Sequence, residues 1–281
     1  MGTLYVVATP IGNLSDISPR AIETLARVAV IACEDTRTSK TLLARHGIAT
    51  RTVSLHQHNE EASGGKLIER LRAGEDIALI SDAGTPGVSD PGARFVALAR
   101  REQIPVIAVP GPNAAIAAWS ISGFTNDRFL FAGFLPSAPA ARRSALRALP
   151  DLVCVILYEA PHRVLDTVAD LAEHYDGARE IVICRELTKK FEESARMRLD
   201  EAGAWLAGAA HRAQGEFVLV LGPGSVPETP GLAEGLRVLE VLSPMLAPGE
   251  AAAAAARITG APRRELYAAA LRQSRERGHA K

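Results

Sequence analysis

Three glycine- and proline-rich segments are the parts of this sequence best suited to chemistry, and each follows a short apolar run. They are TPIGNL (9–14), SDAGTPGVSDPG (81–92) and PGPNA (110–114). Glycine lets a backbone approach a ligand closely, and proline stiffens the loop that carries it. The middle segment has three glycines, two prolines and five Ser, Thr or Asp residues, whereas a simple strand-to-helix loop has about two to six residues. We interpret it as a ligand-binding loop, with a tight structural turn as the alternative.

The three segments lack the motifs of the common nucleotide sites. None has the GxxxxGK[ST] pattern of a phosphate-binding loop, and none has GxGxxG followed by an acidic residue about 20 positions later. A ligand is expected outside the carboxyl ends of the strands, where open parallel sheets bind their ligands.

Charged side chains gather near the ends of predicted strands in three clusters, which could supply an acid, a base or a cation. The clusters are Glu34, Asp35, Arg37 and Lys40; Glu159, His162 and Arg163; and Arg185, Glu186 and Lys189. Each cluster also has a simpler structural explanation. The first could cap a helix and form an ion pair, the second could be the exposed start of a helix, and the third could be an exposed run whose charges pair with one another. As substrate-facing residues we select Asp35, Arg37, Glu159, His162 and Arg163, and the identity of any base is left open.

The elements that must position these residues alternate between short apolar runs and helical patterns in the first half of the chain. Strands are predicted at 4–9, 29–34, 52–56, 76–83 and 105–111, and helices at 18–28, 38–47, 66–74, 93–103 and 113–123. This alternation predicts a mostly parallel sheet within an N-terminal α/β domain over residues 1–120.

The second half has a different pattern, typical of a mixed sheet. Strands are predicted at 129–136, 153–160, 180–187 and 216–223, with an edge strand at 191–199, and helices near 139–149, 161–175 and 200–210. These form a second α/β domain over 121–224. The Pro- and Gly-rich segment 225–231 is predicted to be a linker, and residues 232–281 to be a small module of three helices, the last two arranged like a helix–turn–helix.

The charge of the chain depends on the segment. The 281 residues carry 32 Lys and Arg and 32 Asp and Glu, so the net charge is zero, which excludes a broadly basic nucleic-acid coat. Residues 1–120 have net charge 0 (12 basic, 12 acidic), residues 121–231 have −3 (12 and 15) and residues 232–281 have +3 (8 and 5). A local basic surface is therefore expected in the C-terminal module.

Metal, disulfide and membrane sites are not indicated. The cysteines are three in number and widely spaced, without a CxxC motif. No apolar stretch reaches the about 18 residues of a membrane span, and the N-terminus lacks the charged and apolar regions of a signal peptide. We expect a reduced, cytoplasmic, soluble protein with no metal.

The motifs taken together resemble those of a known family. The runs VATPIGNLSDISPRAIETL, ACEDTRTSKTLL, ISDAGTPGVSDPG and VPGPNA, with GFLP, YEAPHR, CRELTKKFEE and GEFVLVL later, are similar to the tetrapyrrole methylase superfamily. The resemblance covers essentially the whole chain. ACEDTRTSK and SDAGTPGVSDPG favour the ribosomal branch, the 16S rRNA (cytidine-2′-O)-methyltransferases, over the branches that act on porphyrinoids.

The resemblance implies a two-domain, non-Rossmann methyltransferase fold, with S-adenosylmethionine in a cleft between the domains. It also implies 2′-O-methylation of a cytidine in the decoding centre of 16S rRNA within the 30S subunit, and a homodimer. By the match of its loops, the cofactor-binding residues would be Pro10, Gly12, Asn13, Ser81, Asp82, Ala83, Gly84, Thr85, Pro86, Val88, Pro112, Asn113, Ala114 and Tyr158.

An RNA substrate requires local positive charge. The expected RNA-binding residues are Lys40, Arg142, Arg143, Arg147, Lys189, Arg263 and Arg264. Two other functions remain open. One is a methyltransferase of the same fold that acts on a tetrapyrrole or another small substrate, and the other is a non-catalytic ribosome assembly factor.

Overall fold

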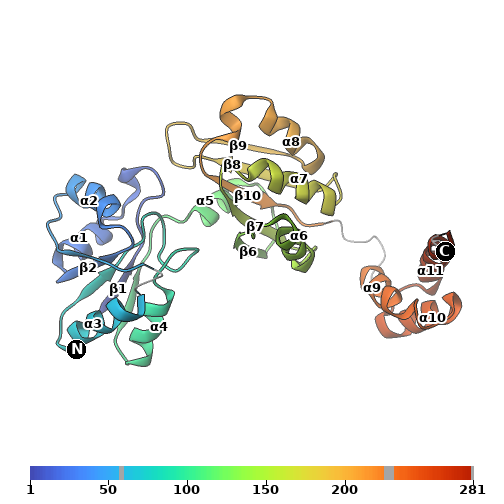
Figure 1. Ribbon diagram of the computed structural model, residues 1–281, viewed down its shortest axis with the longest axis horizontal. Helices are drawn as coiled ribbons and strands as arrows, with labels where there is room; N and C mark the ends of the chain where they lie inside the picture. The colour runs from blue at the N-terminus through green and yellow to red at the C-terminus, as the bar shows by residue number, and fades with distance from the viewer. Residues whose placement is uncertain (57–59, 225–230, 280–281) are drawn as a thin grey trace. The chain divides into compact units, whose positions relative to one another are not determined.

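The computed structural model describes residues 1–56, 60–224 and 231–279. The chain forms two compact units, Met1–Pro223 and Gly224–Lys281 (Figure 1). The linker predicted at 225–231 falls almost entirely on residues 225–230, which lie outside the described part of the chain.

The first sheet of the larger unit is parallel throughout, with the order β3-β2-β4-β1-β5. Its strands are β1 (Leu4–Val7), β2 (Val30–Cys33), β3 (Thr52–Ser54), β4 (Ile77–Leu79) and β5 (Val106–Val109). Because their carboxyl ends share one edge, the three glycine-rich loops that follow β1, β4 and β5 emerge side by side.

Helices cover both faces of this sheet, as the apolar runs of its strands require. Helices α1 (Pro19–Arg27) and α2 (Thr36–Arg45) pack on one face with the buried side chains Leu25 and Leu43. Helices α3 (Glu60–Arg72) and α4 (Ala93–Arg101) pack on the other face, with Leu71 and Phe95. The short 3₁₀ helix η1 (Leu14–Asp16) lies between β1 and α1.

The second sheet is mixed, with the order β6-β7-β10-β8-β9. Its strands are β6 (Phe129–Phe134), β7 (Cys154–Glu159), β8 (Glu180–Arg185), β9 (Glu193–Arg198) and β10 (Phe217–Leu221). Only the β6–β7 pair is parallel. One face is covered by α6 (Pro139–Ala148), α7 (Val164–His174) and α8 (Leu199–Ala207), and the 3₁₀ helix η2 (Ala210–Ala213) follows α8.

Helix α5 (Ala114–Ile121) follows the first sheet in the chain but packs on the uncovered face of the second. Its small side chains Ala115 and Ala118 are buried among Ile156, Val218 and Val220. This helix therefore places the loop after β5 directly beside the strands β7 and β10.

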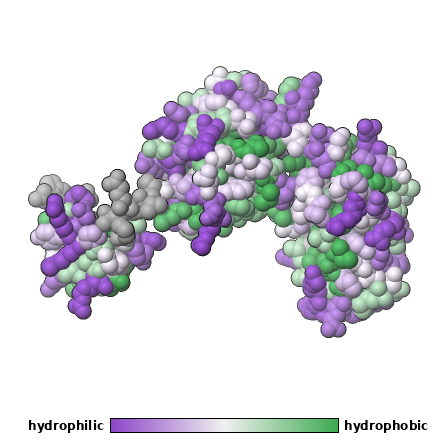
Figure 2. Space-filling model, turned by 180° about the vertical axis from the view of Figure 1, so that it is seen from behind, coloured by the Kyte–Doolittle hydropathy of each residue, from purple (hydrophilic) through white to green (hydrophobic). Residues whose placement is uncertain are grey.

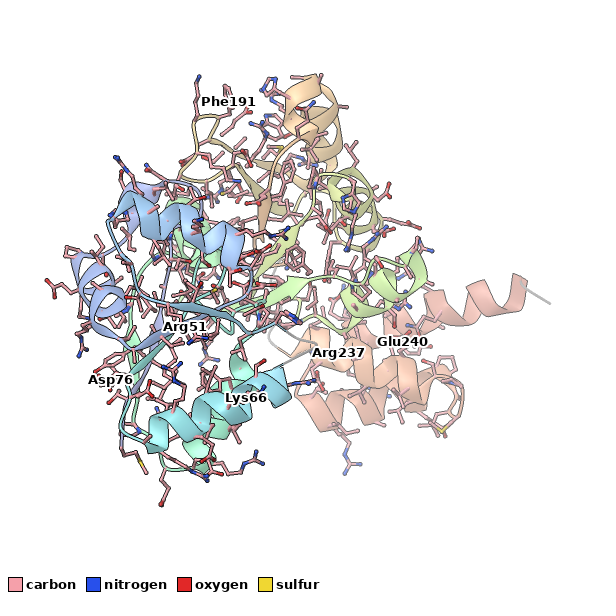
Figure 3. The ribbon with its side chains drawn as sticks, turned by 60° about the vertical axis from the view of Figure 1, so that its left-hand side comes forward. Arg51, Lys66, Asp76, Phe191, Arg237 and Glu240 are labelled. Atoms are coloured by element: carbon pink, nitrogen blue, oxygen red, sulfur yellow. The ribbon has the colours of Figure 1, made fainter. Side chains whose placement is uncertain are left out.

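The smaller unit has a core of its own. Helices α9 (Leu232–Leu242), α10 (Pro248–Thr259) and α11 (Arg263–His279) bury Leu239, Ala252 and Leu266 together. The chain turns between α10 and α11 at Gly260, which has a φ of +73° and ends α10. Polar side chains such as Arg237 and Glu240 of α9 are seen in Figure 3.

These observations confirm the predicted fold class, and the differences are at element ends. Helix α2 begins at Thr36, two residues earlier than predicted, because the Asp35 side chain caps it. Helix α3 begins at Glu60 rather than near residue 66, since Leu67 and Leu71 anchor it on the sheet and the helix extends back through the glycine pair Gly64–Gly65. Helix propensity alone disfavours that glycine pair.

Candidate functional site

The three glycine-rich loops are joined to one another at the carboxyl edge of the first sheet. Thr9 and Gly84 exchange two backbone hydrogen bonds, of 2.8 and 3.1 Å between N and O. Thr85 donates from Oγ1 to the carbonyl of Pro112 at 3.1 Å. Gly84 has a φ of +81°, a conformation that glycine adopts without strain. The loops therefore act as one rigid platform rather than three separate turns.

A cavity of about 410 Å³ lies on this platform and is closed by the second sheet. Its walls are largely apolar, and a few polar side chains reach it from the loops and strand ends. The described residues that line it are Ile11, Ala83, Gly84, Thr85, Val88, Ser89, Asp90, Asn113, Ala114, Phe134, Tyr158, Glu159, Ala160, Pro161, Leu187, Glu216, Phe217 and Val218. Mostly apolar walls with a few placed polar groups are typical of small-molecule sites of this size.

Tyr158 connects the second sheet to the platform. Its hydroxyl accepts a hydrogen bond of 3.1 Å from the backbone N–H of Ala115, in the first turn of α5. Its ring makes edge contacts with Phe131 and Phe134, at 5.0 and 5.5 Å between centroids. Burial raises the pKa of the Tyr158 phenol, the bond from Ala115 opposes the rise, and the nearby Asp90 adds to it. Tyr158 is thus a neutral aromatic wall of the cavity.

Asp90 is the lining carboxyl group with the most perturbed environment. Burial raises its pKa, the side chain of Ser81 opposes the rise by hydrogen bonding, and the charge of Asp82 adds to it. Burial and the charges of Asp82, Asp90 and Asp35 also raise the pKa of Glu34. A raised carboxyl pKa beside a cavity is the property expected of a proton acceptor near neutral pH.

A second, smaller cavity of about 270 Å³ lies next to the first and is formed by the first domain alone. Its lining residues come from α2 and from the segments that follow β1 and β4: Pro10, Leu14, Thr38, Ser39, Thr41, Leu42, Ile80, Ser81 and Asp82.

The predicted cofactor-binding residues divide between these two cavities. The larger cavity is lined by Ala83, Gly84, Thr85, Val88, Asn113, Ala114 and Tyr158, and the smaller by Pro10, Ser81 and Asp82. Four predicted residues line neither cavity: Gly12, Asn13, Pro86 and Pro112. Asn13 caps η1 with its side chain, and Pro112 accepts the bond from Thr85. Asn13 and Pro112 therefore shape the platform.

Asp35 and Arg37 form a helix cap with an ion pair, which is the structural alternative stated above for their cluster. Asp35 accepts a hydrogen bond from the Arg37 backbone N–H and pairs with its guanidinium at 2.7 Å. The side-chain and backbone hydrogen bonds from Arg37 lower the pKa of Asp35 to about 2. A carboxylate with so low a pKa is a poor proton acceptor, which argues against Asp35 as the base.

Glu159 and Arg163 are paired with each other and with neighbouring groups, and Glu159 also lines the larger cavity, so their selection as substrate-facing groups stays a prediction. The Glu159 side chain is 0% exposed and accepts bonds from the Ala160 N–H and the Thr167 hydroxyl, at 2.8 and 2.6 Å. Arg163 lies 3.3 Å from the Glu159 carboxylate and donates to the carbonyl of Leu135 at 2.6 Å. Together they fix the loop after β7. His162 is exposed in that loop, next to a cavity-lining proline, and keeps its predicted role as a hypothesis.

Three of the predicted RNA-binding residues, Arg142, Arg143 and Lys189, form ion pairs within the chain. Arg142 is buried and donates from Nε to Asp170 at 2.5 Å, so its selection is corrected. Lys189 bridges Glu186 and Glu216 at 2.9 Å each, which leaves its ammonium little capacity for a phosphate. Five of the predicted residues are exposed: Lys40, Arg143, Arg147, Arg263 and Arg264.

Comparison with known proteins gives the family. A family model described as Tetrapyrrole (Corrin/Porphyrin) Methylases matches residues 3–203. The chain is a member of the tetrapyrrole methylase family. A second model, RsmI C-terminal HTH domain, matches residues 229–274 of this tetrapyrrole methylase. The second match covers the helical unit α9–α11.

Relatives over nearly the full length confirm the resemblance to the ribosomal branch. The chain is 48% identical over 275 residues to a protein of Pseudomonas aeruginosa named Ribosomal RNA small subunit methyltransferase I, covering 97% of this chain and 98% of the relative. Relatives with the same name from Xylella fastidiosa (strain Temecula1) and Escherichia coli O157:H7 are 45% and 42% identical, covering 95% and 97% of this chain and 98% and 96% of theirs. This tetrapyrrole methylase is therefore a methyltransferase.

Solved structures confirm the fold. A diphthine synthase superposes with a TM-score of 0.61 at 16% identity, covering 81% of this chain and 92% of that chain. The uroporphyrin-III C-methyltransferase of Thermus thermophilus, complexed with S-adenyl homocysteine, superposes with a TM-score of 0.55 at 18% identity, covering 79% and 97%. Within the described residues, no helix of this tetrapyrrole methylase is long and apolar enough to cross a membrane.

Several lining residues of the cavity were missed by the choice of site residues from the sequence. Asp90 lies within the SDAGTPGVSDPG loop, Phe134 within GFLP and Glu216 within GEFVLVL, so each belongs to one of the motifs that carry the family resemblance. Leu187 lies in the same way within CRELTKKFEE. A distinction between lining and supporting positions within a motif needs the tertiary structure.

Proposed function

We propose that this methyltransferase transfers a methyl group from S-adenosylmethionine to the ribose 2′-oxygen of a cytidine in the decoding centre of 16S rRNA, within the 30S subunit. The observation that carries the proposal is the cavity on the three joined loops, in a chain whose full-length relatives are named ribosomal RNA small subunit methyltransferase I. The reaction would take place in the cytoplasm, where small ribosomal subunits are found.

The larger cavity fits a cofactor that has an adenine ring and a positive sulfonium but no phosphate. Apolar side chains such as Val88 and Phe134 provide walls for the ring, and Asp90 provides negative charge for the cation. No Lys or Arg is among the described residues that line the cavity, in contrast to a phosphate site. When bound there, S-adenosylmethionine supplies an electrophilic methyl group.

The chain's own residues then position the acceptor and remove its proton. The residues that line the cavity would have to bring O2′ into line with the carbon–sulfur bond of the bound cofactor, which would give its methyl group to O2′ and keep the electron pair of that bond on sulfur. The hydroxyl proton passes to a base, since a ribose hydroxyl is a poor nucleophile at neutral pH. Asp90 is the carboxylate best placed for this role, because it lines the cavity and burial raises its pKa.

The test of this function is methyl transfer from labelled S-adenosylmethionine to 30S subunits that lack the modification, followed by mapping of the modified nucleotide. A single labelled 2′-O-methylcytidine in the decoding centre is the expected result. Label in a porphyrinoid rather than in rRNA would favour the small-substrate alternative. Binding of the 30S subunit without transfer would favour the assembly factor.

The exposed arginines at the start of α11 are proposed to hold rRNA phosphates. Arg263 and Arg264 lie in the first turn, where the helix dipole disfavours positive charge, so they do not stabilise the helix. In helix–turn–helix units the N-terminal residues of the second helix contact nucleic acid. On unit Met1–Pro223, the exposed residues Lys40, Arg143 and Arg147 are proposed to bind rRNA phosphates as well.

Reversing either arginine is expected to weaken binding of the 30S subunit while leaving cofactor affinity unchanged. In Arg263→Glu or Arg264→Glu, the slope of log K against log salt should fall by about 1, as for one lost phosphate contact. Arg237→Glu is the matched control, since it changes the same charge on α9 of the same unit. Equal salt slopes in all three variants and the wild type would contradict the proposal.

An apolar surface around α5 supports the proposed homodimer. Ile116 and Ile121 of α5 are 52% and 49% exposed, and Ile107 of the edge strand β5 is 45% exposed. Stacking of Trp119 on Phe129, with 4.8 Å between centroids, extends this face to the edge strand β6. Apolar surface is visible on this unit in green in Figure 2. Large exposed apolar side chains gathered on one helix are a feature of interfaces between proteins.

Light scattering should give about twice the chain mass of 29.8 kDa for the wild type at micromolar concentration, and the single mass for Ile116→Glu. The substitution places a charge on a face that the dimer would bury, which is costly without a partner. Lys66→Glu, on α3, serves as the control and should leave the mass unchanged. A wild type with the single mass would refute the homodimer.

A further inference from the structure

The smaller cavity has the composition of a site for a flat, polar-edged ring. Pro10, Leu42 and Ile80 give it apolar surfaces, on which the faces of a planar ring can pack. Its polar edge comes from Thr38, Ser39 and Thr41 on α2, and from Ser81 and Asp82 after β4. At about 270 Å³, it falls slightly below the range of roughly 300–1,000 Å³ that is usual for drug-sized ligands. A single-ring group suits it better than a whole cofactor does.

Ser39 supplies an independent indication of a ligand. It is 4% exposed, and its Oγ has no hydrogen-bonding partner among the described residues. The buried thiol of Cys33, whose pKa burial raises, lies beside it but is a weak partner. A buried hydroxyl without a partner is uncommon, and one that lines a cavity is explained by a group that occupies the cavity.

Asp82 supplies a hydrogen-bond acceptor in the same cavity. Its Oδ1 accepts the backbone N–H of Asp35 at 3.1 Å, which holds the side chain in place. Within the described residues, its Oδ2 accepts no hydrogen bond. A fixed carboxylate is the group that proteins use to accept from the exocyclic amino group of cytosine.

The two cavities are adjacent along a single loop. Ser81 and Asp82 line the smaller one, and the next three residues, Ala83, Gly84 and Thr85, line the larger one. A nucleotide whose base enters the smaller cavity would therefore present its ribose to the larger one. Sequence-specific recognition of RNA uses such splayed-out bases, read on their Watson–Crick edge.

We propose that the smaller cavity binds the extruded pyrimidine base of the target nucleotide, and that Asp82 selects cytosine over uracil. This inference rests on the proposed function. Asp82 accepts from the N4 amino group, whereas uracil would place a carbonyl oxygen against the carboxylate. The Ser39 hydroxyl bonds to the polar edge of the ring.

The first test fills the cavity. Thr41 is exposed at its rim, so Thr41→Phe should fold and block the base. We expect transfer to 30S subunits to fall at least about 100-fold, as when reacting groups lose their alignment, with calorimetric affinity for S-adenosylmethionine within twofold of the wild type. Ala44→Phe adds a larger side chain to an exposed position of the same helix outside the cavity, and should leave both unchanged.

The second test removes the unpartnered hydroxyl. Ser39→Ala should leave the thermal unfolding midpoint unchanged or slightly raised, because the hydroxyl loses at most a weak contact with the Cys33 thiol. Transfer should nevertheless fall about tenfold, as expected for one lost hydrogen bond to substrate. A lower unfolding midpoint with normal transfer would show a purely structural role and overturn the assignment of Ser39.

The third test separates base recognition from catalysis. Saturation-transfer NMR on the full chain should show contacts with cytidine monophosphate that are weaker for uridine monophosphate and absent in Thr41→Phe. Asp82→Asn should reduce the preference for cytidine, since an amide can donate to the uracil carbonyl. Equal contacts with both nucleotides in the wild type would overturn the selection of cytosine by Asp82.

Two outcomes keep this inference distinct from the proposed function. If Thr41→Phe lowers cofactor affinity as much as it lowers transfer, the cavity belongs to the cofactor and the inference fails while the function stands. The other outcome is that the wild type binds cytidine monophosphate, that Thr41→Phe does not bind it, and that the wild type does not methylate 30S subunits. In that case the proposed function fails and the base site stands.

Discussion

Replacing Asp90 by Asn is expected to lower the rate constant of methyl transfer by about 100- to 10,000-fold, the range for loss of a general base. The substitution keeps the size of the side chain and removes its ability to take a proton. Affinity for S-adenosylmethionine should fall much less, because the apolar walls of the larger cavity are untouched. Single-turnover transfer to 30S subunits, with calorimetry on the same variant, measures the two effects separately.

The pH dependence of the reaction gives a second measurement of the same residue. A base acts when deprotonated, so transfer should be lost as the pH falls through the pKa of Asp90. Burial raises that pKa, and the acid limb of the profile should therefore lie above the range of an ordinary aspartate. The acid limb should disappear in Asp90→Asn.

Asp35→Asn is the control that distinguishes the two candidate bases. The pKa of Asp35 is lowered to about 2 by the hydrogen bonds from Arg37, so this carboxylate acts as a helix cap. Its replacement should cost about 1 kcal/mol of stability at most, because asparagine also caps helices, and should change transfer less than tenfold. A large loss in Asp35→Asn with near-normal transfer in Asp90→Asn would reverse the assignment.

The second large effect is on stability. Asp170→Ala is expected to lower the free energy of unfolding by about 3–5 kcal/mol, because it leaves the Arg142 guanidinium buried without a counter-charge. The side chains of Arg142 and Asp170 are 4% and 8% exposed, and 2.5 Å separates Nε from Oδ2. Urea-induced unfolding followed by circular dichroism measures this loss.

Arg143→Ala is the matched control for this pair. Arg143 also contacts Asp170, at 3.3 Å, but its side chain is 45% exposed. An exposed ion pair contributes about 0–1 kcal/mol, so its removal should change stability little. If Arg143→Ala were as destabilising as Asp170→Ala, the internal role of Arg142 would be refuted. The adjacent arginines Arg142 and Arg143 of α6 thus differ in burial, and only the first is expected to be essential for stability.

The order of elements could be predicted from the sequence because local signals agreed with tertiary packing. Ser18 caps α1 and Pro19 begins it, as their types indicate. The apolar runs that became β2 and β4 are buried strands of a parallel sheet because α3 and α4 cover one face and α1 and α2 the other. Alternation of such runs with helices permits few other arrangements.

The functions of individual charged residues could not be predicted in the same way. Asp90 lies in a glycine-rich loop and Glu159 at the end of β7, and both line the cavity, yet the Glu159 carboxylate accepts hydrogen bonds from Thr167 and Ala160. Arg142 and Arg143 are neighbours, and one is buried while the other is exposed. These differences depend on which side chains distant in the sequence pack against each residue. The type of a residue does not indicate those partners.

By itself, the sequence determined the fold class, the three glycine-rich loops and the resemblance to the ribosomal branch of the tetrapyrrole methylases, because motif and periodicity are local properties of the chain. Only the tertiary structure decided which loop residues line a cavity, since this depends on the Thr9–Gly84 and Thr85–Pro112 contacts and on α5 packing under the second sheet. The same packing separated a cavity of cofactor size from a smaller one beside it. Burial of Asp90 raises its pKa and the hydrogen bonds from Arg37 lower that of Asp35, so their surroundings, rather than residue type, distinguish the two carboxyl groups.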